Sequence, residues 1–355
     1  KIAAENNPGL LSQYKEFEAA LQKVPQVSTL PDPSLAFGYF VSPVETRVGP
    51  QQARFSLTQM FPWFGTLKAQ GDAATLMAEA KYQSFLDAKN KLYYEVSAAY
   101  FPLYELKEWI KIEENNIAIL ESYKTISNSK FRNGNGTLVD VLRVDIMLKE
   151  AKTNLGILNK KEKPLMASFN KLLNREDTQT VTIGDTIVVE PVLIDYNKDT
   201  FMVDHPLLNS IDLKTKSSEA SERAAINQGF PKLGLGLDYV IVGERTDMTL
   251  NDNGKDVLMP MLTVSLPIFR GKYKAAVKEA QLMKESYSLQ KKEIANSLNS
   301  NYEMAFNAKI NKAQLAWLAG KGSYEDALAD LDKLAKDEKN IDYLEYIEKM
   351  DESEI

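Results

Sequence analysis

Four short segments of the chain alternate apolar residues with small or polar ones. Successive side chains of an extended strand point to opposite faces, so this period of two puts the apolar side chains on one face. In the third segment, Gly234, Gly236 and Asp238 fall on the opposite face. The pattern therefore predicts four strands, each with one apolar face and one small or polar face. The apolar positions are Leu35, Phe37, Tyr39, Phe55, Leu57, Leu233, Leu235, Leu237, Leu258, Leu262, Val264 and Leu266.

Longer stretches between these segments carry apolar residues in alternating steps of three and four, which is typical of a helix packed in a coiled coil. One stretch covers residues 66–128, and at ~1.5 Å per residue this helix would be roughly 90 Å long. Residues 133–136 tolerate a positive φ and end the helix, and Thr137 can cap a returning helix that ends near Asn174. The pattern predicts a helical hairpin with an exposed tip. Its apolar seam consists of Phe85, Ala88, Leu92, Val96, Ala99, Leu103, Leu106 and Ile110.

The same order of landmarks occurs twice along the chain. Pro8 and Pro33 recur as Pro206 and Pro231, at one common offset of about 198 residues. Each half predicts a short helix, two strands, a very long helix and a tight turn. The first half continues into a returning helix, whereas the returning helix of the second half is expected to be missing or truncated. The predicted domains are a first repeat at residues 1–177, a linker at 178–203 and a second repeat at 204–355.

Composition removes several classes of function. The net charge is −6 and the chain has no cysteine. Phosphate binding needs a concentrated basic face, so a nucleic-acid partner is disfavoured, and without thiols there is no disulfide or thiolate metal site. The single histidine, His205, corresponds to Asn7 of the first half, which favours a role at a helix start over catalysis. We expect no enzymatic activity, no cofactor and no metal site.

The strand segments contain about ten residues or fewer, which is the length that crosses a bilayer at a tilt. A soluble antiparallel sheet with one face on a core uses the same alternation and is the alternative. Lipid forbids unpaired strand edges, and the smallest membrane barrels have about eight strands, so four strands cannot close a barrel alone. Three copies would supply about twelve strands, a number compatible with an open lumen.

Several of these segments resemble the TolC-like outer-membrane efflux proteins, and the resemblance spans nearly the whole chain. It rests on the start of the chain near Pro8, the strand-to-helix junctions at residues 61–65 and 266–271, and the hairpin tip at residues 134–142. The resemblance implies a mainly helical fold with a small β part. In this fold, long coiled-coil hairpins form an α-barrel, and four strands per chain enter a shared trimeric twelve-stranded membrane β-barrel.

The resemblance also implies a location and partners. The chain would form a homotrimer in the lipid of a Gram-negative outer membrane and extend into the periplasm. A periplasmic adaptor protein and an inner-membrane pump, as in RND efflux systems, would bind it. The trimer would be a passive export channel that is gated at its periplasmic helical tips.

The resemblance assigns residues to this function. Asp342 and Glu345 match acidic positions that ring the closed mouth of such channels, where three copies of an acidic pair repel one another and concentrate cations. The alternative is that both are ordinary solvated acids of the acidic stretch 337–354. The tip residues expected to dock the adaptor are Lys130, Arg132, Asn133, Gly134 and Gly136.

Two other functions fit parts of the pattern. A soluble coiled-coil scaffold would bind partners through its helical faces and would not need detergent. An unrecognised hydrolase is disfavoured because candidate pairs of nucleophile and base are scarce in the sequence.

Overall fold

A computed structural model describes residues 1–184 and 202–318 of the chain. The chain divides into two compact units, one formed by Lys1–Asp195 and His205–Ser288 and the other by Tyr196–Asp204 and Leu289–Ile355. All four strands and the helices α1 to α5 and α7 belong to the first unit. In the described ranges, no helix combines the length and the apolar composition needed to cross a membrane.

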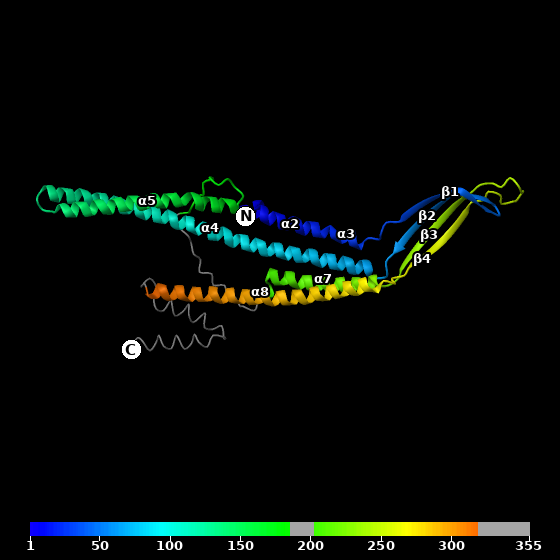
Figure 1. Ribbon diagram of the computed structural model, residues 1–355. Coiled ribbons are helices and arrows are strands. Elements are labelled where there is room, and N and C mark those ends of the chain that lie inside the picture. Colours follow the sequence, from blue (N-terminus) through cyan, green and yellow to red (C-terminus); the bar gives the residue numbers. More distant parts are fainter. Residues whose placement is uncertain (185–201, 319–355) are drawn as a thin grey trace, which may run out of the picture. The chain divides into compact units, whose positions relative to one another are not determined.

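The chain begins with three helical segments in place of the single short helix that was predicted. They are α1 (Ile2–Asn6), α2 (Pro8–Leu21) and α3 (Lys23–Ser28). Each element is short because Asn7 and Gln22 interrupt the helix as caps. All three pack along the long helix that follows the first two strands (Figure 1).

Helices α2 and α7 begin with the same capping arrangement. The Asn7 Oδ1 atom accepts a hydrogen bond of 3.1 Å from the Leu10 N–H, and a proline occupies the first turn of α2. His205 does the same for α7 (Pro206–Gln228), because its Nδ1 atom accepts a hydrogen bond of 3.2 Å from the Leu207 N–H. Burial lowers the pKa of His205, which favours the neutral ring that can accept this bond. The predicted helix-start role of His205 is confirmed.

The predicted helical hairpin is present. Its arms are α4 (Thr66–Arg132) and α5 (Leu138–Leu172), which lie side by side (Figure 1). Helix α4 ends four residues later than predicted, since the residues that tolerate a positive φ begin only at Asn133. Of the predicted seam, Leu92 and Leu103 are buried in a core that also contains Phe169 of α5. The step of three and four along α4 therefore marks a packing face.

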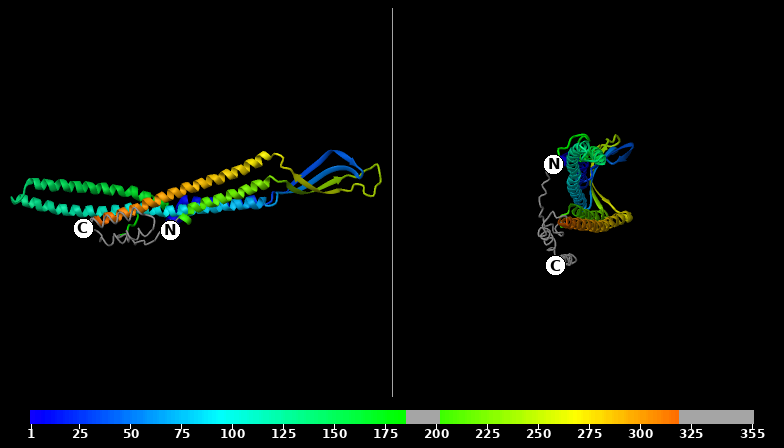
Figure 2. Two further views of the ribbon diagram at one scale, coloured as in Figure 1. Left: turned by 90° about the horizontal axis from the view of Figure 1, so that it is seen from below. Right: turned by 90° about the vertical axis from the view of Figure 1, so that its left-hand side faces the viewer.

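A second helix, α7, packs along the first half of α4 through small residues (Figure 2). Ala80 of α4 and Ala220 of α7 are completely buried. The Ser210 hydroxyl donates a hydrogen bond of 2.8 Å to the Ala80 carbonyl, and the Ser217 hydroxyl donates one of 2.8 Å to that of Ala73. Because these hydroxyls form their hydrogen bonds with the backbone of the facing helix, the two helices can approach closely.

The four predicted strands form one antiparallel sheet in the order β1-β2-β3-β4. Two strands are longer than predicted, with 13 residues each in β1 and β2. The reason is that β1 and β2 stay paired up to the tight turn that follows Thr46, beyond the end of the apolar alternation. Helix α8 (Arg270–Leu318) follows the sheet. The strand bounds are β1 Ser34–Thr46, β2 Gly49–Phe61, β3 Lys232–Val242 and β4 Val257–Ser265.

Candidate functional site

One face of the sheet is apolar across all four strands. The pairing aligns apolar residues in rows that cross the sheet, and the rings of two of them, Phe37 and Phe55, lie 5.0 Å apart. The side chains of this face are open to solvent in the single chain, with exposed fractions of 71% for Leu35, 60% for Leu235 and 70% for Leu262. One complete row consists of Phe37, Phe55, Tyr239 and Leu258.

This exposure decides between the two interpretations of the strand pattern. A soluble antiparallel sheet buries its apolar face on a core. Here the buried side chains of β3 are Asp238, Val240 and Val242, on the opposite face, and the leucines of β3 are exposed. A contiguous exposed apolar surface of this kind marks contact with a membrane or with another protein. The soluble-core interpretation is therefore contradicted.

The opposite face of the sheet carries a polar cluster. Asp238 of β3 is completely buried, and its carboxylate accepts hydrogen bonds from the Arg54 guanidinium and the Ser56 hydroxyl of β2. Part of the Arg54 side chain stays exposed, with a fraction of 46%. A buried carboxylate is tolerated when it is paired and hydrogen-bonded, as it is here. The two faces thus differ in chemistry, as the alternation predicted.

The glycines of β3 leave room for side chains on this polar face. A Cβ atom added to Gly234 would lie 2.5 Å from the Met60 sulfur, and one added to Gly236 would lie 3.1 Å from the Thr58 hydroxyl oxygen. A larger residue at Gly234 would displace the methionine. Glycine at these two positions of β3 therefore makes room for the Met60 and Thr58 side chains of β2.

The loop between β3 and β4 is ordered by its own polar residues. The Asn253 side chain accepts a hydrogen bond of 2.8 Å from the Arg245 N–H and donates one of 3.0 Å to the Arg245 carbonyl. The Gly254 N–H donates a bond of 2.7 Å to the Val48 carbonyl in the turn between β1 and β2. These bonds tie both hairpin ends of the sheet together.

The helical tip is a tight, polar turn. Gly134 has a φ of 75°, and the Asn135 N–H donates a hydrogen bond of 2.8 Å to the Lys130 carbonyl. Thr137 begins α5 in a capping box, because its hydroxyl accepts from the Asp140 N–H and the Asp140 carboxylate accepts from the Thr137 N–H. The predicted turn and the predicted cap are both present.

The tip brings the proposed docking residues together. Lys130, Arg132, Asn133 and Gly134 are exposed and Gly136 is half-buried. Three exposed apolar residues, Leu138, Val139 and Leu142, follow directly in α5. The prediction omitted them, although three apolar residues within one and a half turns at a helix start are a visible signal in the sequence. The predicted gate residues Asp342 and Glu345 lie outside the described residues.

No model of a protein family and no curated protein matches the sequence. Solved structures match across most of the chain. VceC of Vibrio cholerae, an outer membrane protein, has a TM-score of 0.63 at 15% identity, and the match covers 94% of this chain and 88% of VceC. The MtrE outer membrane channel of Neisseria gonorrhoeae has a TM-score of 0.59 at 18% identity, covering 94% and 80%. CusC, whose structures concern transmembrane channel formation, has a TM-score of 0.65 at 14% identity, covering 92% and 83%.

The chain has the TolC-like fold. The long helices and the four antiparallel strands of this chain match that fold. The described part of the chain therefore supplies the helical hairpin α4–α5 and the four-stranded sheet of that fold. The fold class predicted from the sequence is confirmed for these elements.

Proposed function

We propose that this chain is one protomer of a trimeric channel in the outer membrane, which serves as the passive duct of an efflux system. The observation that carries the proposal is the two-faced sheet, with an exposed apolar face on one side and the Asp238 cluster on the other. A wall between lipid and an aqueous lumen needs this distribution of side chains. The TolC-like fold supports the same function.

The edges of the sheet support the trimer. Strands β1 and β4 are the outer strands of the sheet, and each pairs on one side only within the described chain. An unpaired strand edge is too costly to leave in lipid. Pairing β1 of one copy with β4 of the next closes the sheet, and three copies supply about twelve strands. Two copies would supply only about eight strands, which side chains fill, so the homotrimer is the smallest assembly with an open lumen.

The channel performs no chemical step in this proposal. In this proposal the channel opens and closes at its gate, selects ions by charge and binds an adaptor protein. Asp342 and Glu345 form the gate at the periplasmic mouth, where three copies of the pair repel one another and attract cations. Opening moves the three acidic pairs apart, which relieves the repulsion. The gate assignment is argued from the sequence. The docking assignment is argued from the geometry of the hairpin tip.

Docking uses the tip of the α4–α5 hairpin. Lys130 and Arg132 provide positive charge beside the turn, and the open backbone of Gly134 lets a partner approach closely. Gly136 supports the tip from within, because an added Cβ atom there would lie 3.1 Å from the Cβ atom of Lys130. The partners we propose are a periplasmic adaptor protein and, through it, an inner-membrane pump. Exposed apolar residues at the start of α5 add the contact area that an adaptor helix needs.

A soluble coiled-coil scaffold is the weaker candidate. It would explain the hairpin but would leave the apolar face of the sheet in water. A substitution of Leu235 by a charged residue separates the two functions, because a scaffold tolerates charge on a water-exposed face. A lipid-facing position does not, and the cost near the bilayer midplane is about 2–4 kcal/mol.

The experiment that tests the proposed function is reconstitution. The chain is extracted from membranes in detergent, its oligomeric mass is measured, and it is added to a planar lipid bilayer. We expect a trimer that gives discrete steps of conductance. A water-soluble monomer that leaves the bilayer silent would refute the proposal.

A further inference from the structure

The charged residues in the regularly paired part of the described sheet all lie on its polar face. There are three of them, Arg54, Lys232 and Asp238. Lys232 and Asp238 share the face of Gly234 along β3, and Arg54 of β2 lies opposite Val240, which is on the same face. In the proposed channel this face lines the lumen. The paired positions are residues 34–39, 53–61, 232–241 and 257–265.

The negative charge of this face is buried, and the positive charges are not. Asp238 is completely buried, whereas Lys232 is exposed and 46% of the Arg54 side chain is exposed. The Asp238 carboxylate is held by hydrogen bonds from Arg54 and Ser56. Both accessible charges are therefore cations, and three copies would place about six of them around the lumen.

The Arg54 guanidinium keeps hydrogen-bond donors for a ligand. Within residues 1–184 and 202–318, its hydrogen bonds go to Asp238 and to the Met261 sulfur, and both come from the Nη2 atom. A guanidinium has five N–H groups, so those of Nε and Nη1 remain available. They can donate to the oxygens of a carboxylate or a phosphate, and such charge-assisted bonds are strong.

The approach to Arg54 from the side of β1 is open. Its partner on that strand is Gly38, and a Cβ atom added to Gly38 would have no other atom within 4 Å. Strands β2 and β3 are the two inner strands of the sheet. Pairing of the edge strands between protomers therefore leaves the surroundings of Arg54 as they are in the single chain.

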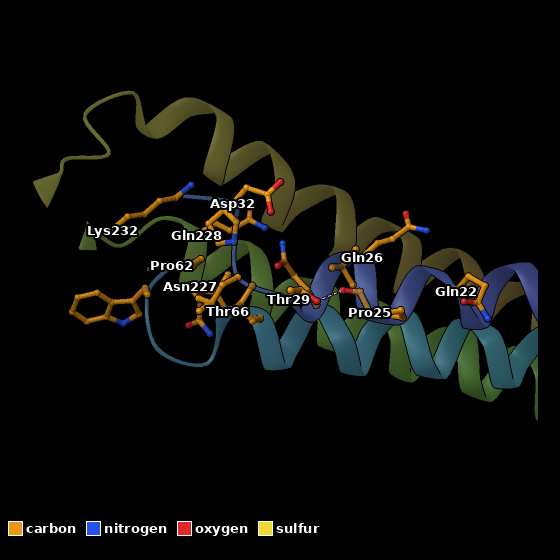
Figure 3. A pocket seen from close by; sticks show the side chains of 16 residues that line it. Gln22, Pro25, Gln26, Thr29, Asp32, Pro62, Thr66, Asn227, Gln228 and Lys232 are labelled. Carbon is orange, nitrogen blue, oxygen red and sulfur yellow. Dashed lines mark hydrogen bonds between the residues drawn. The ribbon is translucent and has the colours of Figure 1, made fainter. Parts of the chain in front are cut away.

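Lys232 adds a second level of positive charge near the helices. It occupies position 232 of β3, whereas Arg54 lies opposite position 240, which places the two levels ~26 Å apart at ~3.3 Å per residue. Figure 3 shows Lys232 and Asp32 near one end of a cavity of about 930 Å³ at the start of α4. No ion pair within the described residues joins these two side chains. Because this wall also carries an acid, Lys232 is the weaker of the two cationic levels.

We propose that Arg54 is a selectivity residue that favours anionic solutes in the part of the lumen enclosed by the sheet, and that Lys232 supports it. Asp238 is a positioning residue, because it holds the guanidinium against the wall and leaves the Nε and Nη1 donors to the lumen. The solutes are small molecules that carry carboxylate or phosphate groups. The inference rests on the proposed function, since only a closed barrel turns this face into a lumen.

The test is the block of single-channel current by inorganic tripolyphosphate, added to both chambers of a planar bilayer. We expect the anion to block the unaltered channel in a concentration-dependent manner. Asp238→Asn keeps a hydrogen-bond acceptor for Arg54 and removes the buried negative charge. This variant should be blocked at a lower concentration than the unaltered channel.

A second variant isolates the charge of Arg54. Asp238→Asn combined with Arg54→Gln removes the cation and leaves no buried charge unpaired. Its half-blocking concentration should be about tenfold higher than that of Asp238→Asn alone, because three exposed charge contacts, one per protomer, are lost together. Lys232→Gln in the unaltered background should raise the half-blocking concentration by a smaller factor.

The matched control is Lys160→Gln, since Lys160 is an exposed lysine of α5 and lies outside the sheet. It should be blocked like the unaltered channel. Equal block of Asp238→Asn with and without Arg54→Gln would overturn the proposal. An equal loss of block in the Lys160→Gln channel would overturn it too, because the effect would then follow the net charge of the protein.

The same recordings separate this inference from the proposed function. Channels that conduct but are not blocked by tripolyphosphate contradict only the role of Arg54 and Lys232. Absence of conductance steps in the unaltered protein contradicts the channel itself.

Discussion

At the scale of single residues, the contact between α4 and α7 depends on small side chains. Ala220 of α7, the helix that packs along α4, is completely buried. Ala220→Leu inserts three carbons there and should lower the free energy of unfolding by about 1–3 kcal/mol. Denaturation followed by circular dichroism measures the change. The control is Ala98→Leu at an exposed position of α4, and equal stability of the two variants would contradict the close packing of this seam.

The gate proposal is also a statement about single residues. Replacement of Asp342 and Glu345 by alanine removes the repelling acids from the axis, so we expect a changed single-channel conductance and a weaker preference for cations. Planar-bilayer recordings measure both. The control pair Asp351→Ala with Glu352→Ala removes the same charge from the same acidic stretch. If both pairs change the recordings equally, the acids act as diffuse solvated charge and the gate assignment is wrong.

Residues that act locally could be predicted from the sequence. Asn7, Thr137 and His205 occupy helix starts because a side-chain acceptor beside a first turn satisfies nearby N–H groups, and this depends on a few neighbouring residues. The bond between Arg54 and Asp238 could not be predicted. It joins residues 184 positions apart, and their register follows only from the pairing of β2 with β3.

At the scale of elements, two ion pairs connect the arms of the hairpin. Lys152 of α5 pairs with Glu121 of α4 at 2.8 Å, and Lys124 of α4 pairs with Asp145 of α5 at 2.6 Å. The hydrogen bond from each lysine lowers the pKa of its acidic partner below the ordinary 4.5 of Glu121 and 3.8 of Asp145. A lowered pKa means that the stabilisation is complete above these ordinary values and is lost as the pH falls below them.

The hairpin should therefore open more often in acid. We expect the protection of its amides against hydrogen exchange, corrected for the intrinsic rate, to fall below about pH 4. Glu121→Gln with Asp145→Asn should show reduced protection at neutral pH and little further loss in acid. Glu114→Gln, at an exposed position of α4, serves as the control and should behave like the unaltered protein. A pH profile that is the same in all three proteins would contradict the contribution of these pairs.

The elements themselves were predictable because their patterns are periodic. A period of two marked the apolar face of each strand, and residues that tolerate a positive φ marked the end of α4. The ends of β1 and β2 were not predictable, since pairing continues past the last apolar residue. The cavity at the start of α4 was also hidden, because three separate stretches of the sequence, within residues 22–32, 62–70 and 227–232, form its wall.

At the scale of the whole molecule, the fold tolerates wide variation in sequence. Solved structures with 14–18% identity share it across at least 92% of this chain. The physical reason is that an apolar alternation and a helical seam specify the class of side chain and leave its identity free. Contacts between distant elements can then differ while the order of elements persists.

The trimer predicts a contact between the edge strands of neighbouring copies. The chain has no cysteine of its own, so one cysteine in β1 and one in β4 should form disulfides between protomers in a register scan. Oxidised samples should show dimers and trimers on a non-reducing gel. Thr58→Cys with Gly236→Cys, which face each other within one chain, should give only an internal bridge. A scan in which no edge pair links two chains would exclude the shared barrel.

The central claim is that one face of the sheet contacts lipid and the other contacts water. Single cysteines at residues 258–264 of β4, in protein reconstituted into liposomes, can be tested with a water-soluble thiol reagent. The account predicts reactive cysteines at Met259 and Thr263, which are exposed on the polar face, and cysteines protected by lipid at Leu258, Leu262 and Val264 on the apolar face. Labelling that does not alternate along β4 would contradict the account.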